Sequence, residues 1–476
     1  MKKRNKTKVV ATIGPASNTR SILKKLILSG VDVARLNLSH GTHKEHGEVI
    51  NTIRSLSRET KRPVGILLDL QGPKIRTGKL KDGKPVLLKR NGTIRITTKK
   101  ISGTDELIST TYDRLVNDVK KGDKMLLDDG LIELRVLSKD KDSVLCKIIN
   151  GGLLKEHKGI NLPGVNVSAP SLTEKDKKDL KFGIKAGVDY FALSFVRTAG
   201  DLKAIKSIIA KHGVHIPVIA KIEKPEAVDN LDSILKIADG IMVARGDLGV
   251  EIRPEQVPAI QKNIISKAIL ANKPVITATQ MLETMTENPI PTRAEASDVA
   301  NAIYDGTDAV MLSGETASGK YPVKAVQMMV SIASEAEKSP FMNYNIYYEK
   351  DPKDLVTHAI AQSAVNILYE VDAKAIITFS VSGKTSKLIS KQRPPQHVYA
   401  FSPSVEVYNR LSLVWGIIPL LIPPINDTRK IIEAGEKIIV ENKFAKKNDL
   451  VIIVTGLALK AGSTNLIKIH RIGQED

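Results

Sequence analysis

The feature that most constrains the fold is a series of eight short apolar runs, each followed by a segment with helical spacing. The runs are Lys8–Gly14, Val33–Ser39, Val64–Asp69, Tyr190–Phe195, Pro217–Glu223, Gly240–Gly246, Pro274–Gln280 and Ala309–Gly314. Eight alternating β and α units predict a closed (β/α)8 barrel. Each run carries polar or charged residues at its carboxyl end, where the active sites of such barrels lie. The pattern therefore predicts one shared mouth, lined by Asn37, Ser39, Asp69, Lys221, Glu223, Asp247, Thr279 and Ser313.

The spacing is interrupted once, between the third and fourth runs. The intervening segment has alternating, turn-rich strand patterns, at Pro85–Lys89, Thr93–Thr97, Lys124–Gly130 and Ile132–Val136. It predicts a small β-barrel domain inserted at the mouth, where it would act as a lid that excludes water. A further βα series after Asp351 predicts a separate open α/β domain.

The predicted fold class is therefore α/β: a (β/α)8 TIM barrel with an inserted small β-barrel domain and a C-terminal open α/β domain. We predict that the barrel comprises residues 1–72 and 170–342, the insert residues 73–169, and the C-terminal domain residues 343–476.

Composition is ordinary for a globular protein, with 42% hydrophobic and 26% charged residues among 476. No apolar run reaches the roughly 18 residues that a membrane span needs, and the basic start leads into an apolar piece too short for a signal peptide. Cys146 is the single cysteine, so no intramolecular disulfide can form. These features predict a cytoplasmic protein without a membrane partner.

The net charge of +20 is compatible with a nucleic acid, an anionic membrane or anionic small molecules as partners. The basic residues are spread along the chain, and aromatic residues make up only 4%, which leaves few platforms for stacking bases. We therefore expect no nucleic-acid partner. A lysine-rich surface explains the charge, and attraction of anionic substrates is a second explanation.

Lys221 and Glu223 lie two residues apart on one predicted strand, so both side chains share a face. The next run adds the carboxylate of Asp247. Two carboxylates with room for substrate oxygens suit Mg²⁺, which keeps places for water and phosphate. The alternative is a purely structural ion pair between Lys221 and Glu223.

Arg35 is an arginine inside a predicted strand. A buried, unpaired arginine is too costly to keep without an anion, and the guanidinium fork matches phosphoryl oxygens. The alternative is a salt bridge to Asp69 or Glu223. No Walker loop or strand-linked Gly-x-Gly-x-x-Gly occurs, so phosphates would be held by side chains, metal and helix N-termini.

Several long motifs resemble those of the pyruvate kinase family, in the same order from end to end. They are Lys8–Ser17, Ala34–Gly41, Ala220–Glu223, Gly240–Glu251, Ile276–Met285, Pro291–Ala302 and Met311–Ala317. The resemblance implies phosphoryl transfer from phosphoenolpyruvate to ADP, giving ATP and enolpyruvate, followed by protonation to pyruvate. It also implies a glycolytic homotetramer that uses Mg²⁺, with Mn²⁺ as an alternative.

The resemblance assigns roles residue by residue. Glu223 and Asp247 would hold Mg²⁺, and Lys221, Arg35 and Thr279 would be the catalytic residues. The substrate would contact Arg35, Lys221, Thr279 and the backbone N–H groups of Gly246 and Asp247. The nucleotide site would comprise Asn37, Ser39, His40, Arg76 and Lys175.

The stretch Ile66–Gly78 departs from the potassium-dependent pattern. Potassium-dependent members usually have a threonine and a glutamate where this chain has Leu70 and Lys74. The other residues of the monovalent-cation site, Asn37, Ser39 and Asp69, are retained. We predict that the Lys74 ammonium takes the electrostatic role of K⁺, so that K⁺ is not required. The alternative is that Lys74 lies in solvent and K⁺ still binds.

A hydroxyl-rich turn follows the first strand of the C-terminal domain and leads into a helix. By resemblance, Ser380, Ser382, Gly383, Lys384 and Thr385 would bind the phosphate of an allosteric effector, covered by the loop Gly456–Asn465. The alternative is a plain serine-rich cap. Because the sequence stops at Asp476, we expect no additional phosphohistidine-type domain.

Two other functions compete with this assignment. One is an Mg²⁺-dependent enolate lyase of the pyruvate-type barrel group, which would have no nucleotide for Arg76 and Lys175 to bind. The other is a basic nucleic-acid-binding protein, which would show steeply salt-dependent binding.

Overall fold

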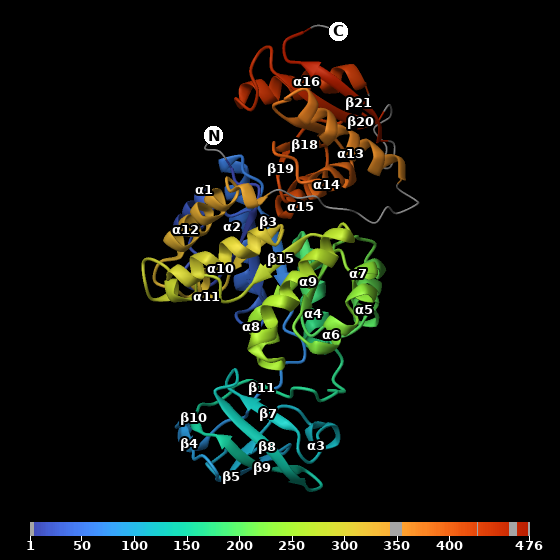
Figure 1. The fold of residues 1–476 in the computed structure, drawn as a ribbon. Helices are drawn as coiled ribbons and strands as arrows, with labels where there is room; N and C mark the ends of the chain where they lie inside the picture. Colours follow the sequence, from blue (N-terminus) through green and yellow to red (C-terminus); the bar gives the residue numbers. More distant parts are fainter. Residues whose placement is uncertain (1–3, 343–354, 426, 457–463, 475–476) are drawn as a thin grey trace.

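The computed structural model describes residues 4–342, 355–425, 427–456 and 464–474. Figure 1 shows three regions in a row: the inserted β segment at one end, the barrel in the middle and the C-terminal α/β region at the other end. The predicted α/β fold class is confirmed.

Eight parallel strands form the closed barrel, in the order β1-β16-β15-β14-β13-β12-β3-β2. They are β1 Lys8–Ile13, β2 Val33–Asn37, β3 Gly65–Asp69, β12 Tyr190–Leu193, β13 Val218–Ile222, β14 Gly240–Ala244, β15 Val275–Ala278 and β16 Ala309–Leu312. Each lies within one of the eight predicted runs. The strands are rich in valine, isoleucine and leucine because helices cover their outer face and packed side chains fill their inner face.

The helices of the barrel region follow the strands. They are α1 Arg20–Ser29, α2 His43–Thr60, α4 Glu174–Ala186, α5 Ala199–Lys211, α6 Pro225–Asp229, α7 Leu231–Ile237, α8 Arg245–Glu251, α9 Val257–Leu270, α10 Arg293–Tyr304, α11 Gly314–Ala317 and α12 Pro322–Ala336. Their starts carry local sequence signals. For example, Thr42 and Glu45 form a capping box that satisfies free N–H groups at the start of α2.

The inserted segment is mostly β, with one short α-helix and a 3-10 turn at Lys81–Gly83. Its elements are β4 Val86–Leu88, β5 Thr93–Thr97, β6 Leu107–Ser109, α3 Leu115–Asp118, β7 Lys124–Leu127, β8 Ile132–Lys139, β9 Ser143–Asn150, β10 Gly152–Leu154 and β11 Ile160–Asn161. The strands pair as a six-stranded sheet, β11-β7-β8-β9-β5-β6, and a two-stranded ribbon, β10-β4. The predicted small barrel therefore takes the form of a sheet and a ribbon around one hydrophobic core. The limits of the insert at residues 73 and 169 stay a prediction.

The outgoing and returning connections of the insert meet at one point. The Gly72 N–H donates to Asp176 Oδ1 at 3.1 Å, which ties the chain after β3 to the first turn of α4. Gly72 has a φ of 68°, and a Cβ there would lie 2.7 Å from the Phe195 ring. Only glycine fits this position without strain, so the Gly-Pro break fixes where the insert leaves the barrel.

The C-terminal region is an open α/β sheet of order β19-β18-β17-β20-β21. Its elements are α13 Leu355–Glu370, β17 Ile376–Phe379, α14 Lys384–Lys391, β18 Val398–Ser402, α15 Val405–Arg410, β19 Ile417–Leu421, α16 Thr428–Glu441, β20 Leu450–Gly456 and β21 Thr464–Arg471. Four of these strands, β17 to β20, lie at the apolar runs of the predicted βα series, which are Ala375–Ser380, Val398–Ser402, Gly416–Leu421 and Leu450–Thr455. The antiparallel edge strand β21 was missed because it is largely polar and partly exposed, so it lacks the apolar run of a buried strand.

The C-terminal region packs on the amino ends of the barrel strands through buried charges. Lys391, at the end of α14, makes a 2.6 Å ion pair with Asp308 and donates to the Lys273 carbonyl at 2.9 Å. Arg393 lies 3.3 Å from the same carboxylate. Lys8, at the start of β1, donates to the Ile417 carbonyl at 2.7 Å. These contacts place the C-terminal region opposite the insert, as Figure 1 shows.

Lys391 is expected to make stability depend on pH. Burial, opposed by the charge of Asp308, lowers the pKa of Lys391 to about 8 from 10.5. Between these values the unfolded chain binds more protons than the folded protein, so stability rises with pH. The gain in the free energy of unfolding approaches about 3 kcal/mol between these two pH values. Urea unfolding at about pH 7.5 and about pH 10 should show a smaller gain for Lys391→Met than for wild type. Equal gains would contradict the assignment.

No helix within the described residues is long and apolar enough to cross a membrane. Two predictions fall partly outside the described residues. They concern the start of the C-terminal domain at residue 343 and, within the predicted covering loop, residues 457–463.

Candidate active site at the mouth of the barrel

Arg35 and Asp69 form the floor of the mouth. The two side chains come from the adjacent strands β2 and β3. Arg35 Nε and Nη2 both lie 2.7 Å from Asp69 Oδ2, and Arg35 Nη1 donates to Thr12 Oγ1 at 2.9 Å. Both residues are buried. Of the partners considered for a buried arginine, the structure pairs Arg35 with Asp69 and not with Glu223.

Lys221 lies at the centre of the mouth, between two carboxylates. Its Nζ is 2.7 Å from Glu223 Oε1 and 3.4 Å from Asp69 Oδ1, and it donates to Ser194 Oγ at 2.8 Å. Glu223 Oε2 accepts the Phe195 N–H at 2.8 Å. The predicted shared face of Lys221 and Glu223 is confirmed, and the ion pair that was the structural alternative is present as well.

These buried charges shift one another's pKa values. Burial raises the pKa of Asp69, but Lys221 and Arg35 outweigh burial and leave it below the ordinary value. Burial lowers the pKa of Lys221, but Asp69 and Glu223 outweigh burial and leave it raised. Lys221 is therefore a fixed positive charge at neutral pH, suited to stabilise negative charge and not to act as a base.

The carboxylate of Asp247, in the first turn of α8, faces this cluster. Its negative charge raises the pKa of both Lys221 and Glu223. Burial and Asp247 together leave the pKa of Glu223 above its ordinary value. Within the described ranges, no group of three or more histidine, cysteine, aspartate or glutamate side chains could hold a metal ion. The pair of carboxylates fits Mg²⁺, an oxygen-seeking ion that takes its remaining ligands from substrate and water.

Thr279 follows β15 and lies against the start of α8. Its hydroxyl accepts the Gly246 N–H at 2.7 Å and donates to the Ala278 carbonyl at 2.5 Å. The structure therefore brings Thr279, Gly246 and Asp247 together. The Gly246 N–H that the resemblance assigns to a substrate carboxylate is held here by the threonine hydroxyl.

The residues predicted to line a nucleotide site gather at one side of the mouth. Burial, then the charges of Arg76, Lys74 and Arg35, lower the pKa of His40, which places these cations around the exposed histidine. The Ser39 N–H donates to Asn37 Oδ1 at 3.0 Å.

Lys175 extends this positive side from α4. Its Nζ donates to the Leu38 carbonyl at 2.7 Å and makes a 2.6 Å ion pair with Asp179. The Lys175 ammonium therefore contacts the segment that carries Ser39 and His40.

Lys74 is exposed, and its charge acts on His40, the neighbour of Ser39. It lines a cavity between the insert and the barrel, together with Asn161, Phe195, Lys224 and Asp247 among others. Asn161 and Lys224 both bind Glu251, at 2.9 and 2.5 Å, and so connect the two walls of this cavity. The exposure of Lys74 is compatible with either alternative, and its role in place of K⁺ stays a prediction.

The hydroxyl-rich turn of the C-terminal region precedes α14. Gly383 has a φ of 73°, and its N–H donates to Ser380 Oγ at 2.9 Å. The Lys384 N–H is 3.4 Å from Ser382 Oγ, and the Thr385 hydroxyl bonds Thr464 at 2.6 Å. The serine hydroxyls thus accept backbone N–H groups of the turn, as in a serine-rich cap. The effector role of the turn stays a prediction.

Sequence reasoning assigned no role to Ser194, Thr12 or Arg245. Ser194 was detectable, because it is the polar end of the fourth run, like the other mouth residues. Thr12 and Arg245 lie in the motifs named above. The groups that they contact are distant in sequence, so no local pattern predicts a role for either residue.

Comparison with known proteins shows matches to one family along most of the chain. The family model described as pyruvate kinase, barrel domain, matches residues 4–326, and the model described as pyruvate kinase, alpha/beta domain, matches residues 358–470. A curated pyruvate kinase of Geobacillus stearothermophilus is 48% identical over 475 residues, covering 98% of this chain and 81% of the relative. One of Sporosarcina psychrophila is 47% identical over 473 residues, covering 98% and 80%.

A solved structure shows the same likeness in three dimensions. A crystal structure of a pyruvate kinase from Cryptosporidium parvum superposes with a TM-score of 0.93 at 41% identity, covering 98% of this chain and 96% of that one. The lyase alternative is not favoured by these matches. The predicted phosphotransferase is confirmed, because the chain belongs to the pyruvate kinase family.

Proposed function

We propose that this chain transfers the phosphoryl group of phosphoenolpyruvate to ADP with the help of Mg²⁺ and then protonates the enolate to pyruvate. The observation that carries the proposal is the convergence of two cations, Arg35 and Lys221, with the Glu223 and Asp247 carboxylates at one mouth. Phosphoryl transfer needs positioning and charge stabilisation more than covalent chemistry.

Each residue has a role that its position supports. Arg35, held by Asp69 and Thr12, presents its guanidinium to the phosphoryl oxygens. Glu223 and Asp247 would hold Mg²⁺, which supplies positive charge to the phosphoryl and enolate oxygens. Lys221 stabilises the charge on the transferring group and on the enolate oxygen. The Gly246 and Asp247 N–H groups, with Thr279, take the substrate carboxylate, and Thr279 lies near the carbon that receives the proton.

The nucleotide side of the mouth is the cationic group around His40. We assign ADP to Asn37, Ser39, His40, Arg76 and Lys175, with the insert closing over it and excluding water. On closure Lys74, which follows the Gly72–Pro73 break and is exposed in the present arrangement, supplies the charge that K⁺ supplies in potassium-dependent members.

The remaining assignments rest on family membership. The protein acts in the cytoplasm as a homotetramer, and the turn at 380–385 binds a phosphorylated effector. Mn²⁺ can replace Mg²⁺, since both accept oxygen ligands in octahedral geometry.

The first test is pyruvate formation from phosphoenolpyruvate, ADP and Mg²⁺ in buffer free of potassium and ammonium. We expect substantial rates that added K⁺ does not raise. Lys74→Glu should lose about tenfold or more in this buffer, because a local charge opposite the transferring phosphoryl is removed, and added K⁺ should restore its rate.

The outcomes separate the two parts of the proposal. A wild-type rate that depends on K⁺, with the same dependence in Lys74→Glu, keeps the enzyme and removes the role of Lys74. No pyruvate from folded protein under any monovalent salt or effector would refute the proposed function itself.

A further inference from the structure

The turn that carries Thr279 has an uncommon backbone. Thr279 and Gln280 both have positive φ values, 69° and 51°. Positive φ is rare for residues other than glycine and is an outlier for a β-branched residue such as threonine. A pair of such residues persists only when surrounding contacts hold it. The turn also places the Thr279 hydroxyl on the Gly246 N–H at 2.7 Å.

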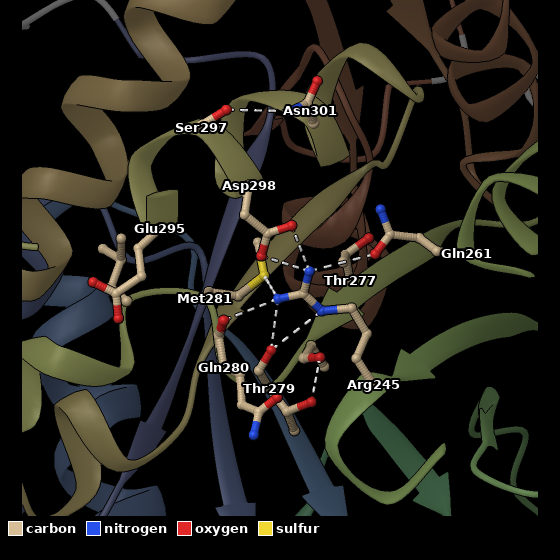
Figure 2. A network of polar contacts seen from close by, with 12 residues as sticks. Arg245, Gln261, Thr277, Thr279, Gln280, Met281, Glu295, Ser297, Asp298 and Asn301 are labelled. Carbon is tan, nitrogen blue, oxygen red and sulfur yellow. Dashed lines mark hydrogen bonds and ion pairs between the residues drawn. The ribbon is translucent and has the colours of Figure 1, made fainter. Parts of the chain in front are cut away.

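The side chain of Arg245 donates hydrogen bonds to the backbone carbonyls of this turn. Arg245 Nη2 donates to the Thr279 carbonyl at 2.7 Å and to the Gln280 carbonyl at 3.1 Å, and Nε reaches the Thr279 carbonyl at 3.3 Å. Figure 2 shows the guanidinium between this turn and the side chain of Asp298.

Asp298, on α10, orients the guanidinium from the other side. Arg245 Nη1 lies 2.8 and 2.6 Å from the two Asp298 oxygens. Nη1 also lies 3.5 Å from Gln261 Oε1 and Nη2 lies 2.8 Å from Met281 Sδ, so each nitrogen of the guanidinium has at least one acceptor. The Arg245 side chain is only 10% exposed, which limits competition from water.

We propose that Arg245 is a positioning residue for the reaction: its fork holds the left-handed Thr279–Gln280 turn in the geometry that places the Thr279 hydroxyl beside Gly246. The inference rests on the proposed role of Thr279 and adds a residue that does not itself touch the substrate. Arg245 also begins α8, so one side chain links the backbone of Thr279 to the helix that carries Asp247.

Lysine cannot replace this arginine in function. A lysine ammonium can pair with Asp298, but it is a point charge on a flexible stem and cannot bridge the carboxylate and two carbonyls in one plane. The Arg245→Lys variant therefore retains the positive charge and loses the clamp on the turn.

A matched control exists at the opposite end of the barrel. Arg54, on α2, also bridges two carbonyls and a carboxylate: Val64 at 3.1 Å, Gly187 at 2.9 Å and Asp189 at 2.8 Å. Val64 and Asp189 precede β3 and β12, so this clamp lies at the amino ends of the strands, away from the mouth. Arg54→Lys measures the effect of losing such a clamp on folding alone.

The test compares steady-state kinetics, melting temperature and a crystal structure for wild type, Arg245→Lys and Arg54→Lys. We expect Arg245→Lys to lose at least about tenfold in kcat and to raise the KM for phosphoenolpyruvate, since small displacements of a reacting group cost up to 10²-fold. The KM for ADP should stay within about twofold of wild type, because the turn lies away from the cations around His40. Arg54→Lys should lower the melting temperature and leave kcat unchanged.

Unchanged kcat and phosphoenolpyruvate KM in Arg245→Lys would overturn the proposal. A crystal structure of Arg245→Lys in which Thr279 keeps its backbone and its contact with Gly246 would overturn it as well, whatever the activity. If Arg245→Lys does not fold, Asp298→Asn, at a half-exposed position, must show a smaller loss of the same pattern, and normal kinetics would refute the proposal. An inactive wild type would refute the proposed function. The role of Arg245 in holding the Thr279–Gln280 turn would then be decided by the crystal structures of wild type and Arg245→Lys alone.

Discussion

Lys221→Met is expected to reduce kcat by a factor on the order of 10³, because it removes a preorganised charge from the centre of a buried site. The ammonium lies 2.7 Å from Glu223 and 3.4 Å from Asp69, and its raised pKa keeps it charged at neutral pH. Methionine has a similar length and no charge, so the loss reports electrostatics more than packing. The rate should be measured with saturating Mg²⁺, phosphoenolpyruvate and ADP.

A matched lysine serves as the control for this prediction. Lys206, on α5, makes a 2.8 Å ion pair with Asp239, which precedes β14 at the amino ends of the barrel strands, away from the mouth. Lys206→Met should keep kcat within about twofold of wild type, since a partly exposed ion pair contributes little. If Lys221→Met retained more than about a tenth of the wild-type rate, the charge would not be central to the reaction.

Asp308→Asn is expected to lower the free energy of unfolding by about 3–5 kcal/mol, because it leaves two buried cations without their carboxylate. Asp308 is fully buried and lies 2.6 Å from Lys391 and 3.3 Å from Arg393. Urea unfolding can be followed by the fluorescence of Trp415, the single tryptophan, since the Arg393 guanidinium lies 4.5 Å from its ring centre.

Replacing Lys391, the partner of Asp308, should lower the free energy of unfolding much less. Lys391→Met leaves Asp308 paired with Arg393 and removes a lysine whose burial already lowers its pKa. Removing one partner of a buried ion pair is costly when the other charge is left uncompensated, and here Arg393 still compensates Asp308. Equal losses in Asp308→Asn and Lys391→Met would mean that packing, and not unpaired charge, determines the stability of this interface.

The strands of the barrel could be predicted because each carries its own signal. A parallel strand covered on both faces needs a continuous apolar run, and all eight runs contain the observed strands. The shared mouth followed from the rule that such strands end at one face. The edge strand β21 has no such requirement, since one side of it is open to solvent, and no run marked it.

The sequence by itself determined the barrel, the position of the insert, the family and the pairing of Lys221 with Glu223, because these depend on spacing within short segments. Only the tertiary structure decided which distant groups meet: Arg35 with Thr12 and Asp69, Arg245 with Asp298 and the Thr279 turn, and Lys391 with Asp308. It also placed Lys74 among the residues that line the cavity between the insert and the barrel. Closing a chain into a barrel brings together residues tens to hundreds of positions apart, and no local pattern carries that information.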